Sequence, residues 1–178
     1  MMKKWNIDRA HSQINFGIEC LGLSIINGSL QEFRGSLEQT RENDFAQSKF
    51  YFQGLTSSIF TGHSERDNHL CSADFFDTQN YSQIKFIGHN VERIDETHYF
   101  IAGALSIKDC KKAISLTAYF KGKQKSIDNS ERLGFEITGL LRRSDFNLNW
   151  NGINEDGVKL IGESVQIHIQ LQLKAKTN

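Results

Sequence analysis

The sequence lacks proline, net charge, a long apolar run and any close pair of cysteines. Its 178 residues contain no proline, which excludes cis-proline turns and polyproline segments. The 21 Lys and Arg residues balance the 21 Asp and Glu residues, whereas a dedicated nucleic-acid binder normally carries a basic excess. No stretch of about 20 consecutive apolar residues occurs, so the sequence predicts no transmembrane helix.

The three cysteines, Cys20, Cys71 and Cys110, are far apart and form no C-x-x-C motif. A zinc knuckle or a thioredoxin-type site is therefore not indicated. We expect them to be buried thiols in a reducing compartment. Met1–Gln13 carries two lysines but no apolar segment behind them, unlike a signal peptide. We therefore expect a cytoplasmic location for the chain as given, or a periplasmic one if a leader has been removed.

The composition is that of one globular domain covering residues 1–178. Hydrophobic residues make up 38% and charged residues 24%, and no internal repeat or linker is visible. Phenylalanine is unusually frequent, with 13 Phe against 4 Tyr and 2 Trp. Because Phe has no polar group, this aromatic content favours a dry interior.

Most of the chain alternates apolar and polar residues with a period of two, which is typical of half-buried strands. The clearest case is residues 165–174, in which Val, Ile and Leu alternate with Gln, His and Lys. Similar segments span residues 13–20, 48–55, 84–94, 98–107, 111–121 and 133–142. Residues 21–33 continue the pattern, but Gly22 and Gly28 interrupt it and indicate a bend or bulge. About eight strands with hairpin-length connections predict an all-β antiparallel sandwich or barrel.

The stretch Thr56–Asp77 (TSSIFTGHSERDNHLCSADFFD) does not alternate. Thr61 is a good N-cap residue, so a short polar helix is expected to follow it. This helix has too few apolar residues to be held by an apolar stripe, so polar contacts or the Phe75–Phe76 pair must hold it. We predict that residues 61–77 form a helical cap on the barrel. The side chains expected to share the helix are His63, Glu65, Asp67 and His69.

Four motifs resemble those of one known family. Trp5–Phe16 has the pattern W-x-I-D-x-x-H-S-x-I-x-F, and Ser58–Asp77 has the longer pattern S-I-x-T-G-x-x-x-R-D-x-H-L-x-S-x-D-F-F-D. Gly103–Ile107 (G-x-L-x-I) and Arg143–Leu148 (R-S-D-F-x-L) follow in order. The sequence thus resembles the YceI-like family, the lipocalin-like polyisoprenoid-binding proteins of bacteria.

The resemblance implies an extended eight-stranded antiparallel barrel with a long interior channel and a short helical cap. It also implies a carrier of isoprenoid or other long-chain lipids, often a homodimer, without catalytic chemistry and without a cofactor. We therefore expect a lipid ligand and no catalytic residue or metal.

In a barrel, inward and outward residues alternate along each strand. The inward set predicted for this chain contains no charged residue, and a filled core is the alternative to a lipid-binding lumen. The predicted lumen residues are Phe16, Ile18, Phe50, Phe52, Phe75, Phe76, Phe86, Leu105, Ile107, Phe135, Ile137 and Phe146.

The cluster of Arg66, Asp67 and His69 is open to three interpretations. With His63, it offers ligand types that zinc accepts, although a third histidine is not close in the sequence. It offers an acid–base pair to a lipid-modifying enzyme, but no nucleophile motif accompanies it. The favoured interpretation is a structural one, in which Arg66 pairs with a carboxylate and His69 with backbone carbonyls. The carboxylates considered for Arg66 are those of Asp74, Asp77 and Asp145.

Arg143 and Asp145 lie near a strand end, where we expect an ion pair that fixes the corner. The polar residues predicted to hold the cap to the barrel rim are Arg66, Asp67, His69, Asp74, Arg143 and Asp145. The sequence thus predicts a binding module that encloses a long apolar molecule. The alternatives are a lipid-modifying enzyme with its site at the barrel mouth and a ligand-free structural barrel.

Overall fold

A computed structural model describes residues 2–42 and 44–176. Within these described residues, one helix, α1 (Ser64–Cys71), and three single 3-10 turns interrupt a chain of antiparallel strands. The turns are η1 (Arg9–His11), η2 (Thr56–Ser58) and η3 (Arg143–Phe146). The strands are β1 (Lys3–Ile7), β2 (Gln13–Cys20), β3 (Ser24–Leu30), β4 (Phe33–Gln39), β5 (Lys49–Leu55), β6 (Ile59–Phe60), β7 (Gln83–Arg93), β8 (His98–Ile107), β9 (Cys110–Lys125), β10 (Glu131–Arg142) and β11 (Ile161–Ala175).

These segments make eight long strands, because the first three are each broken once. Turn η1 separates β1 from β2, residues 31–32 separate β3 from β4, and η2 separates β5 from β6. The ring runs β1-β4-β5-β7-β8-β9-β10-β11, and β1 pairs with β11 to close it, with Trp5 opposite Ala175. Strands β2, β3 and β6 extend the wall beyond β11. The predicted closed eight-stranded antiparallel barrel with one short helix is confirmed.

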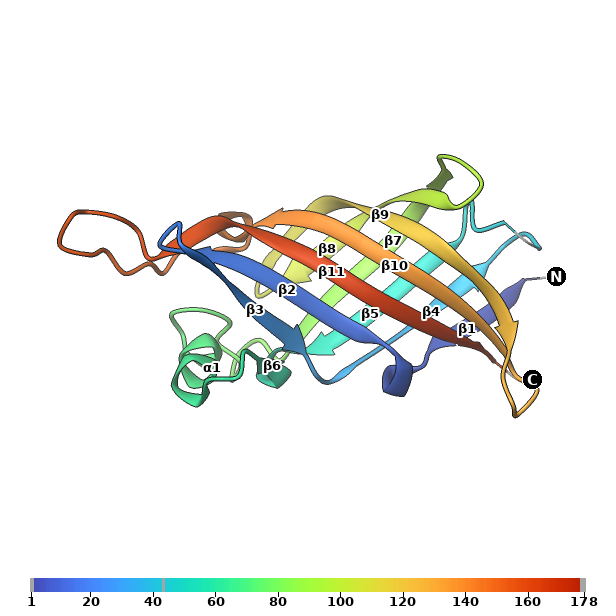
Figure 1. Cartoon of the computed structure of the whole chain (residues 1–178), viewed down its shortest axis with the longest axis horizontal. Helices are drawn as coiled ribbons and strands as arrows, with labels where there is room; N and C mark the ends of the chain where they lie inside the picture. Colours follow the sequence, from blue (N-terminus) through green and yellow to red (C-terminus); the bar gives the residue numbers. More distant parts are fainter. Residues whose placement is uncertain (1, 43, 177–178) are drawn as a thin grey trace.

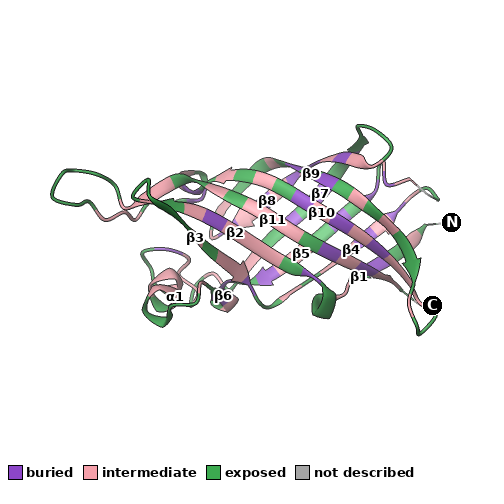
Figure 2. Cartoon of the chain, viewed as in Figure 1, coloured by how far each residue is buried: buried purple, intermediate pink, exposed green. Residues whose placement is uncertain are grey.

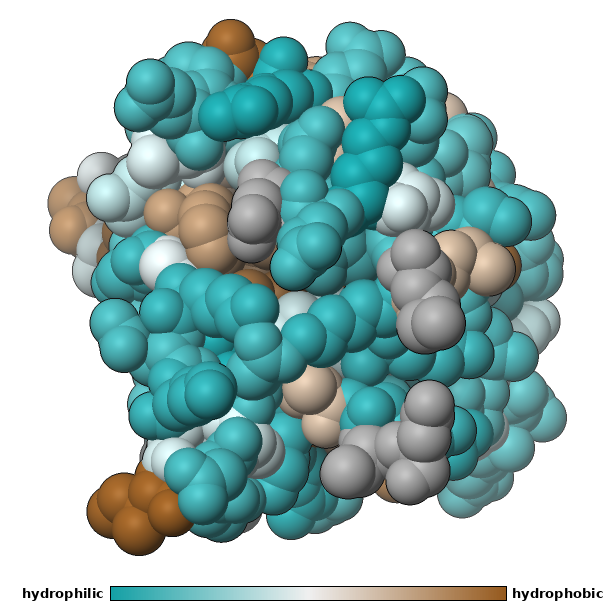
Figure 3. Space-filling view, turned by 90° about the vertical axis from the view of Figure 1, so that its right-hand side faces the viewer, coloured by the Kyte–Doolittle hydropathy of each residue, from teal (hydrophilic) through white to brown (hydrophobic). Residues whose placement is uncertain are grey.

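The barrel is elongated, and its two ends differ (Figure 1). Helix α1 and the loop before β11 lie at one end, and the two chain termini lie at the other. The surface of the terminal end is mostly hydrophilic (Figure 3). Within residues 2–42 and 44–176, no helix is both long and apolar enough to span a bilayer.

Buried and more exposed residues alternate along the strands (Figure 2). In β8, every second residue from Tyr99 to Ile107 is buried, as expected for one face turned inward. The bend predicted at Gly28 is wrong, because Gly28 lies within β3 directly opposite Phe16 of β2. The chain breaks instead at residues 31–32, while Gly22 occupies the β2–β3 turn with a φ of 68°.

An aromatic cluster fills the half of the barrel that lies near the two chain termini. Phe45, from the loop before β5, packs with ring centroids 4.9 Å from both Phe120 and Phe135 and 5.6 Å from Tyr99. Trp5 is buried nearby in the same core and donates its indole N–H to Gln39 Oε1 at 2.9 Å. We call Phe45, Tyr99, Phe120 and Phe135 the aromatic plug. A filled core, one of the sequence-based alternatives, is therefore present in this half of the barrel.

Candidate functional site

The other half of the barrel contains a cavity of about 570 Å³ beneath α1. Its walls are aliphatic and aromatic side chains from strands all around the barrel. Polar side chains enter it mainly from the cap, which supplies Thr61, His63, Glu65, Arg66 and His69, together with Asn15 of β2 and Arg143 of η3.

All of the predicted lumen residues except Phe135 line this cavity. Phe135 does face inward, as its strand alternation predicts, but it lies in the aromatic plug against Phe45 and Phe120. Its assignment to the cavity is therefore wrong. The alternation defines the inner face of β10, but it carries no information on how deeply the loop containing Phe45 folds into the barrel.

Several lining residues were missed by the sequence analysis. One group consists of inward-facing aliphatic residues that stay only half-buried because the cavity exposes them: Ile14, Ile114, Leu141, Val165, Ile167 and Ile169. The alternation of residues 165–173 already contained this signal. Trp150 also lines the cavity, but it lies in an irregular segment, where no periodicity marks it.

The cap is held by a compact set of hydrogen bonds around Thr61. The Asp67 Oδ1 atom accepts from the Thr61 backbone N–H at 2.9 Å and from the Thr61 hydroxyl at 2.6 Å. Arg66 donates from Nε to Thr61 Oγ1 at 2.7 Å and from Nη2 to the Thr61 carbonyl at 3.0 Å. The N-cap of α1 is His63 rather than Thr61. Thr61 instead joins the helix to the end of β6.

The partners predicted for the cap residues need correction. Arg66 binds Thr61, whereas Asp74 accepts from His69 Nε2 at 2.9 Å and Asp77 accepts from Asn80. The predicted carbonyl contacts of His69 are thus replaced by a carboxylate contact. Short polar side chains within one turn satisfy each other locally, and sequence spacing alone does not rank these neighbours.

An aromatic contact joins the cap to the segment after η3. The Phe75 ring centroid lies 5.4 Å from that of Trp150, and the His69 ring stands edge-on to both, at 5.0 Å from Phe75 and 4.6 Å from Trp150. Phe75 is buried, although no residue of α1 itself is. The apolar contacts of the cap therefore come mainly from residues that follow the helix.

The ion pair predicted between Arg143 and Asp145 is wrong. Arg143 is buried and donates to three backbone carbonyls, those of Gly162 (2.9 Å), Leu148 (2.6 Å) and Trp150 (2.7 Å). Asp145 is exposed at the surface of η3. The close return of the chain after η3, through Asn147 at a φ of 56°, places these carbonyls around the guanidinium.

The neighbouring carboxylate of Glu163 accepts from the hydroxyl and the backbone N–H of Ser144. The Ser144 hydroxyl is the main cause that lowers the pKa of Glu163, and the charge of Arg143 contributes less. Glu163 is thus engaged with Ser144 at the outer side of η3.

The zinc interpretation of the cap has no geometric support. Across the described parts of the chain, no group of three or more His, Cys, Asp or Glu residues lies close enough to hold a metal ion. His63 turns its Nδ1 atom toward the backbone N–H of Arg66 at 3.5 Å, and Asp67 is engaged with Thr61.

Comparison with known proteins identifies the family. The model of the YceI-like domain matches residues 5–173. The chain belongs to the YceI-like family. A UPF0312 protein of Staphylococcus aureus (strain MSSA476) is 32% identical over 166 residues, which cover 93% of this chain and 94% of that protein. A UPF0312 protein of Pseudomonas putida (strain W619) is 30% identical and is covered to 84% of its length.

Solved structures share the fold of this YceI-like protein. BcnA of Burkholderia cenocepacia superposes with a TM-score of 0.81 at 17% identity, covering 93% of this chain and 98% of BcnA. The YceI protein of Campylobacter jejuni gives 0.75 at 25% identity, covering 87% and 88%. A polyisoprenoid-binding domain from Saccharophagus degradans gives 0.68 at 13% identity, covering 97% and 98%.

Proposed function

We propose that this YceI-like protein encloses a long apolar amphiphile, with an isoprenoid or fatty chain, and carries it without chemical change. The observation that supports this function is the apolar cavity of about 570 Å³. Protein interiors are normally packed with few voids larger than a water molecule. A cavity of this size lies within the range of about 300–1,000 Å³ that small-molecule sites occupy. A ligand-free structural barrel would have no need of it.

Enclosure by desolvation supplies enough free energy for binding. Each buried methylene contributes about 0.8 kcal/mol, so a chain with about 20 buried carbons gains up to about 16 kcal/mol. Loss of translational freedom and ordering of the chain oppose this with about 4–15 kcal/mol. Micromolar binding needs a net gain of about 8 kcal/mol, which lies within the resulting range without any ionic contact. Selectivity among similar chains is expected to be weak, because one methylene distinguishes ligands by only about 1–3 kcal/mol.

A structural relative supports the same class of ligand. The Saccharophagus degradans domain, which shares the fold, is described as polyisoprenoid-binding. The cavity of this chain has the apolar lining that such a ligand requires.

The hydrogen bonds of the cap favour binding over catalysis. Both Arg66 and Asp67 are engaged with Thr61, and His69 is engaged with Asp74. Each group named for acid–base chemistry thus has a partner within the cap. A carrier requires only that the cap cover the cavity.

Mass spectrometry of an organic extract of the purified protein tests the proposal. We expect a near-stoichiometric lipid in the wild type. Ile167→Glu places a carboxylate in the cavity and should reduce the retained lipid at least about tenfold, because an apolar chain cannot solvate a charge. Gln166→Glu is the matched control, since its exposed side chain precedes Ile167 on the opposite face of β11 and should retain lipid.

Absence of lipid from the wild type, together with no uptake of polyprenyl or fatty compounds by the delipidated protein, would refute the carrier function. Retention by Ile167→Glu equal to that of Gln166→Glu would show that the lipid lies outside this cavity. Circular dichroism of both variants establishes that each is folded.

A further inference from the structure

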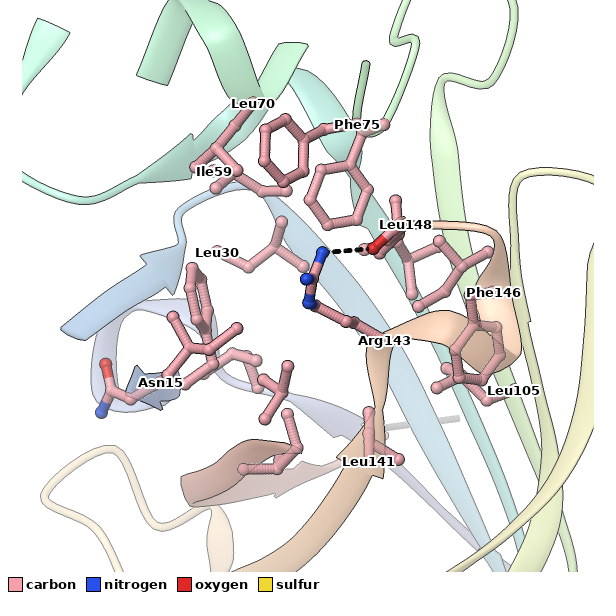
Figure 4. Close-up of a pocket in the computed structure, with 18 of the residues that line it drawn as sticks. Asn15, Leu30, Ile59, Leu70, Phe75, Leu105, Leu141, Arg143, Phe146 and Leu148 are labelled. Carbon is pink, nitrogen blue, oxygen red and sulfur yellow. Dashed lines mark hydrogen bonds between the residues drawn. The ribbon is translucent and has the colours of Figure 1, made fainter. Parts of the chain in front are cut away.

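Arg143 is a buried cation in the wall of a largely apolar cavity. Only 6% of the residue is exposed, and η3 projects it inward from the end of β10. In Figure 4 its guanidinium lies between Leu30 and Leu148, below Phe75. A charge in such surroundings is unfavourable unless hydrogen bonds and an opposite charge compensate it.

The protein satisfies only part of this guanidinium. Arginine has five N–H donors. Nε donates to the carbonyl of Gly162, and Nη1 donates to the carbonyls of Leu148 and Trp150. These three bonds leave the two N–H groups of Nη2 without an acceptor among residues 2–42 and 44–176.

The positive charge of Arg143 also has no carboxylate in direct contact, and it acts on Glu163 only as a lesser cause of the lowered pKa of that carboxyl group. No Asp or Glu among the described residues lies within ion-pair distance of Arg143. Glu163 is engaged with Ser144, and Asp145 is exposed. The three carbonyl groups orient the guanidinium and supply only partial charges. Arg143 therefore presents a fixed cation with two free donors toward the cavity.

Arg66, the other arginine that lines the cavity, differs in its burial. It is only half-buried, and both its Nε and its Nη2 donate to Thr61. Its neighbour Glu65, which also lines the mouth, carries a negative charge. An anion in the cavity is therefore bound more strongly at Arg143, where burial excludes competing water, than at the half-buried Arg66 of the cap.

We propose that Arg143 binds an oxyanion head group, a carboxylate or a phosphate, of the enclosed amphiphile through Nη2. The proposal rests on the proposed lipid-binding function. Charge-assisted hydrogen bonds of this kind are short and strong, and exclusion of water from the cavity strengthens them. The head group lies beneath the cap near η3, and the tail runs past Ile137 and Leu171 toward the aromatic plug. The ligand class is thus a single-tailed anionic lipid held by its head group.

Matched ligand pairs test the charge requirement on the wild type. Stearate is compared with stearyl alcohol, and geranylgeranyl monophosphate with geranylgeraniol, by titration of the delipidated protein below the aggregation concentration of each lipid. We expect each anion to bind at least about tenfold more tightly than its alcohol, as one hydrogen bond to a charged group accounts for. Acetate and inorganic phosphate, which have no tail, should not displace either anion.

Two arginine variants locate the effect. Arg143→Gln should bring the Kd values of each anion and its alcohol to within about threefold of one another, and Arg143→Lys should restore part of the difference because it keeps the charge. Arg142→Gln is the matched control, since Arg142 is exposed next to Arg143 and does not line the cavity, and it should keep the full wild-type preference. Thermal melting accompanies each titration, since Arg143 also joins three carbonyls and its loss destabilises the η3 corner.

Photolabelling of the wild type tests the position of the head group even if the Arg143 variants do not fold. A fatty acid with a diazirine next to the carboxylate should label peptides that contain residues 75–76 and 143–150. The same acid with the diazirine at the end of its tail should label the deeper parts of β8, β10 and β11.

The outcomes separate this proposal from the proposed function. Equal affinity for anion and alcohol, or a head-group label on the deep strands, overturns the role of Arg143 while lipid binding stands. An anion preference that persists in a folded Arg143→Gln variant also overturns it. If neither the anions nor the alcohols bind, the proposed function fails and the role of Arg143 fails with it.

Discussion

Phe16 lies across Gly28 on the neighbouring strand, and this pair shapes one wall of the cavity. A Cβ atom at Gly28 would lie 2.8 Å from both Cε atoms of the Phe16 ring and closer still to Cζ. The ring therefore occupies the space that a side chain at position 28 would need. Gly28 does not have a positive φ, so backbone conformation does not require a glycine here. The glycine is required because the Phe16 ring approaches its Cα closely.

Gly28→Ala should accordingly lower the free energy of unfolding by about 1–3 kcal/mol, the usual cost of overpacking. Urea denaturation measures this change. Gly134→Ala in β10 is the control, because its new Cβ would meet its nearest neighbour at 3.5 Å. A folded Gly28→Ala variant should also bind lipid more weakly, since the displaced Phe16 ring lines the cavity. Equal stability of the two variants would contradict this account.

Glu131 is a second residue whose side chain alone affects stability, and it lies at the end of the barrel near the chain termini. Its carboxylate pairs with Lys123 and Lys3, and these two contacts lower its pKa from 4.5 to about 2. A carboxyl group with a depressed folded-state pKa stabilises the protein above its unfolded pKa and loses this effect as pH falls through the folded value. The contribution of Glu131 is therefore present at neutral pH and is lost between about pH 4.5 and 2.

Glu131→Gln should be less stable than the wild type at pH 7 by about 0.5–1 kcal/mol, as is usual for solvent-accessible ion pairs. The difference should shrink in high salt and vanish toward pH 2. Thermal melting across this pH range measures it. A difference that stays constant with pH would assign the loss to packing rather than to charge.

At the scale of elements, the cap is built on a helix that has no buried residue of its own. No residue of α1 is buried, so the helix depends on Asp67 and Arg66 at Thr61 and on the Phe75–Trp150 contact. Eight residues are too few for a helix that is stable by itself. Opening of α1 is therefore expected to cost less free energy than unfolding of the barrel.

Asp67→Ala should open the cap selectively. The backbone N–H and the hydroxyl of Thr61 lose their shared acceptor, which costs about 1–3 kcal/mol. Amide hydrogen exchange in residues 64–71 should become at least about tenfold faster, while exchange in β8 to β11 stays unchanged. Asn68→Ala, exposed on the same helix, serves as control. Uniformly faster exchange across the barrel would mean that Asp67 supports the whole fold.

The contrast between regular strands and irregular segments explains which features of the structure the sequence could predict. Period-two alternation identifies the inward face of each strand, and it therefore predicted antiparallel strands and lining residues such as Phe86 and Leu105, whereas the closed eight-stranded barrel was implied by the family resemblance. Where the chain is irregular, side-chain partners depend on turn geometry that spacing does not encode. For this reason Arg66 was assigned to an acid instead of Thr61, and Arg143 to Asp145 instead of three carbonyls. Trp150 was missed for the same reason.

At the scale of the whole molecule, the interior is divided along the barrel axis. The aromatic plug fills the half near the termini, and the cavity occupies the half beneath α1. The plug sets the depth of the cavity and thus the longest tail that can be enclosed. Chain length is then a property of the barrel as a whole, whereas preference for a head group belongs to one residue.

Ile137→Trp tests this division, because Ile137 is buried in the cavity wall on β10, the strand that also carries Phe135 of the plug. In the wild type, affinity for saturated fatty acids should rise by up to about fourfold per added methylene until the tail reaches the plug. The larger indole ring shortens the cavity, so the rise should end at a shorter chain.

Thr138→Trp, exposed on the outer face of the same strand, should reproduce the wild-type series. Isothermal titration with acids of increasing length provides the measurement. If the longest fatty-acid tail that gains affinity were the same in Ile137→Trp as in the wild type, the tail would lie elsewhere. A lipid tail lying between β8, β10 and β11 could not pass the added indole ring.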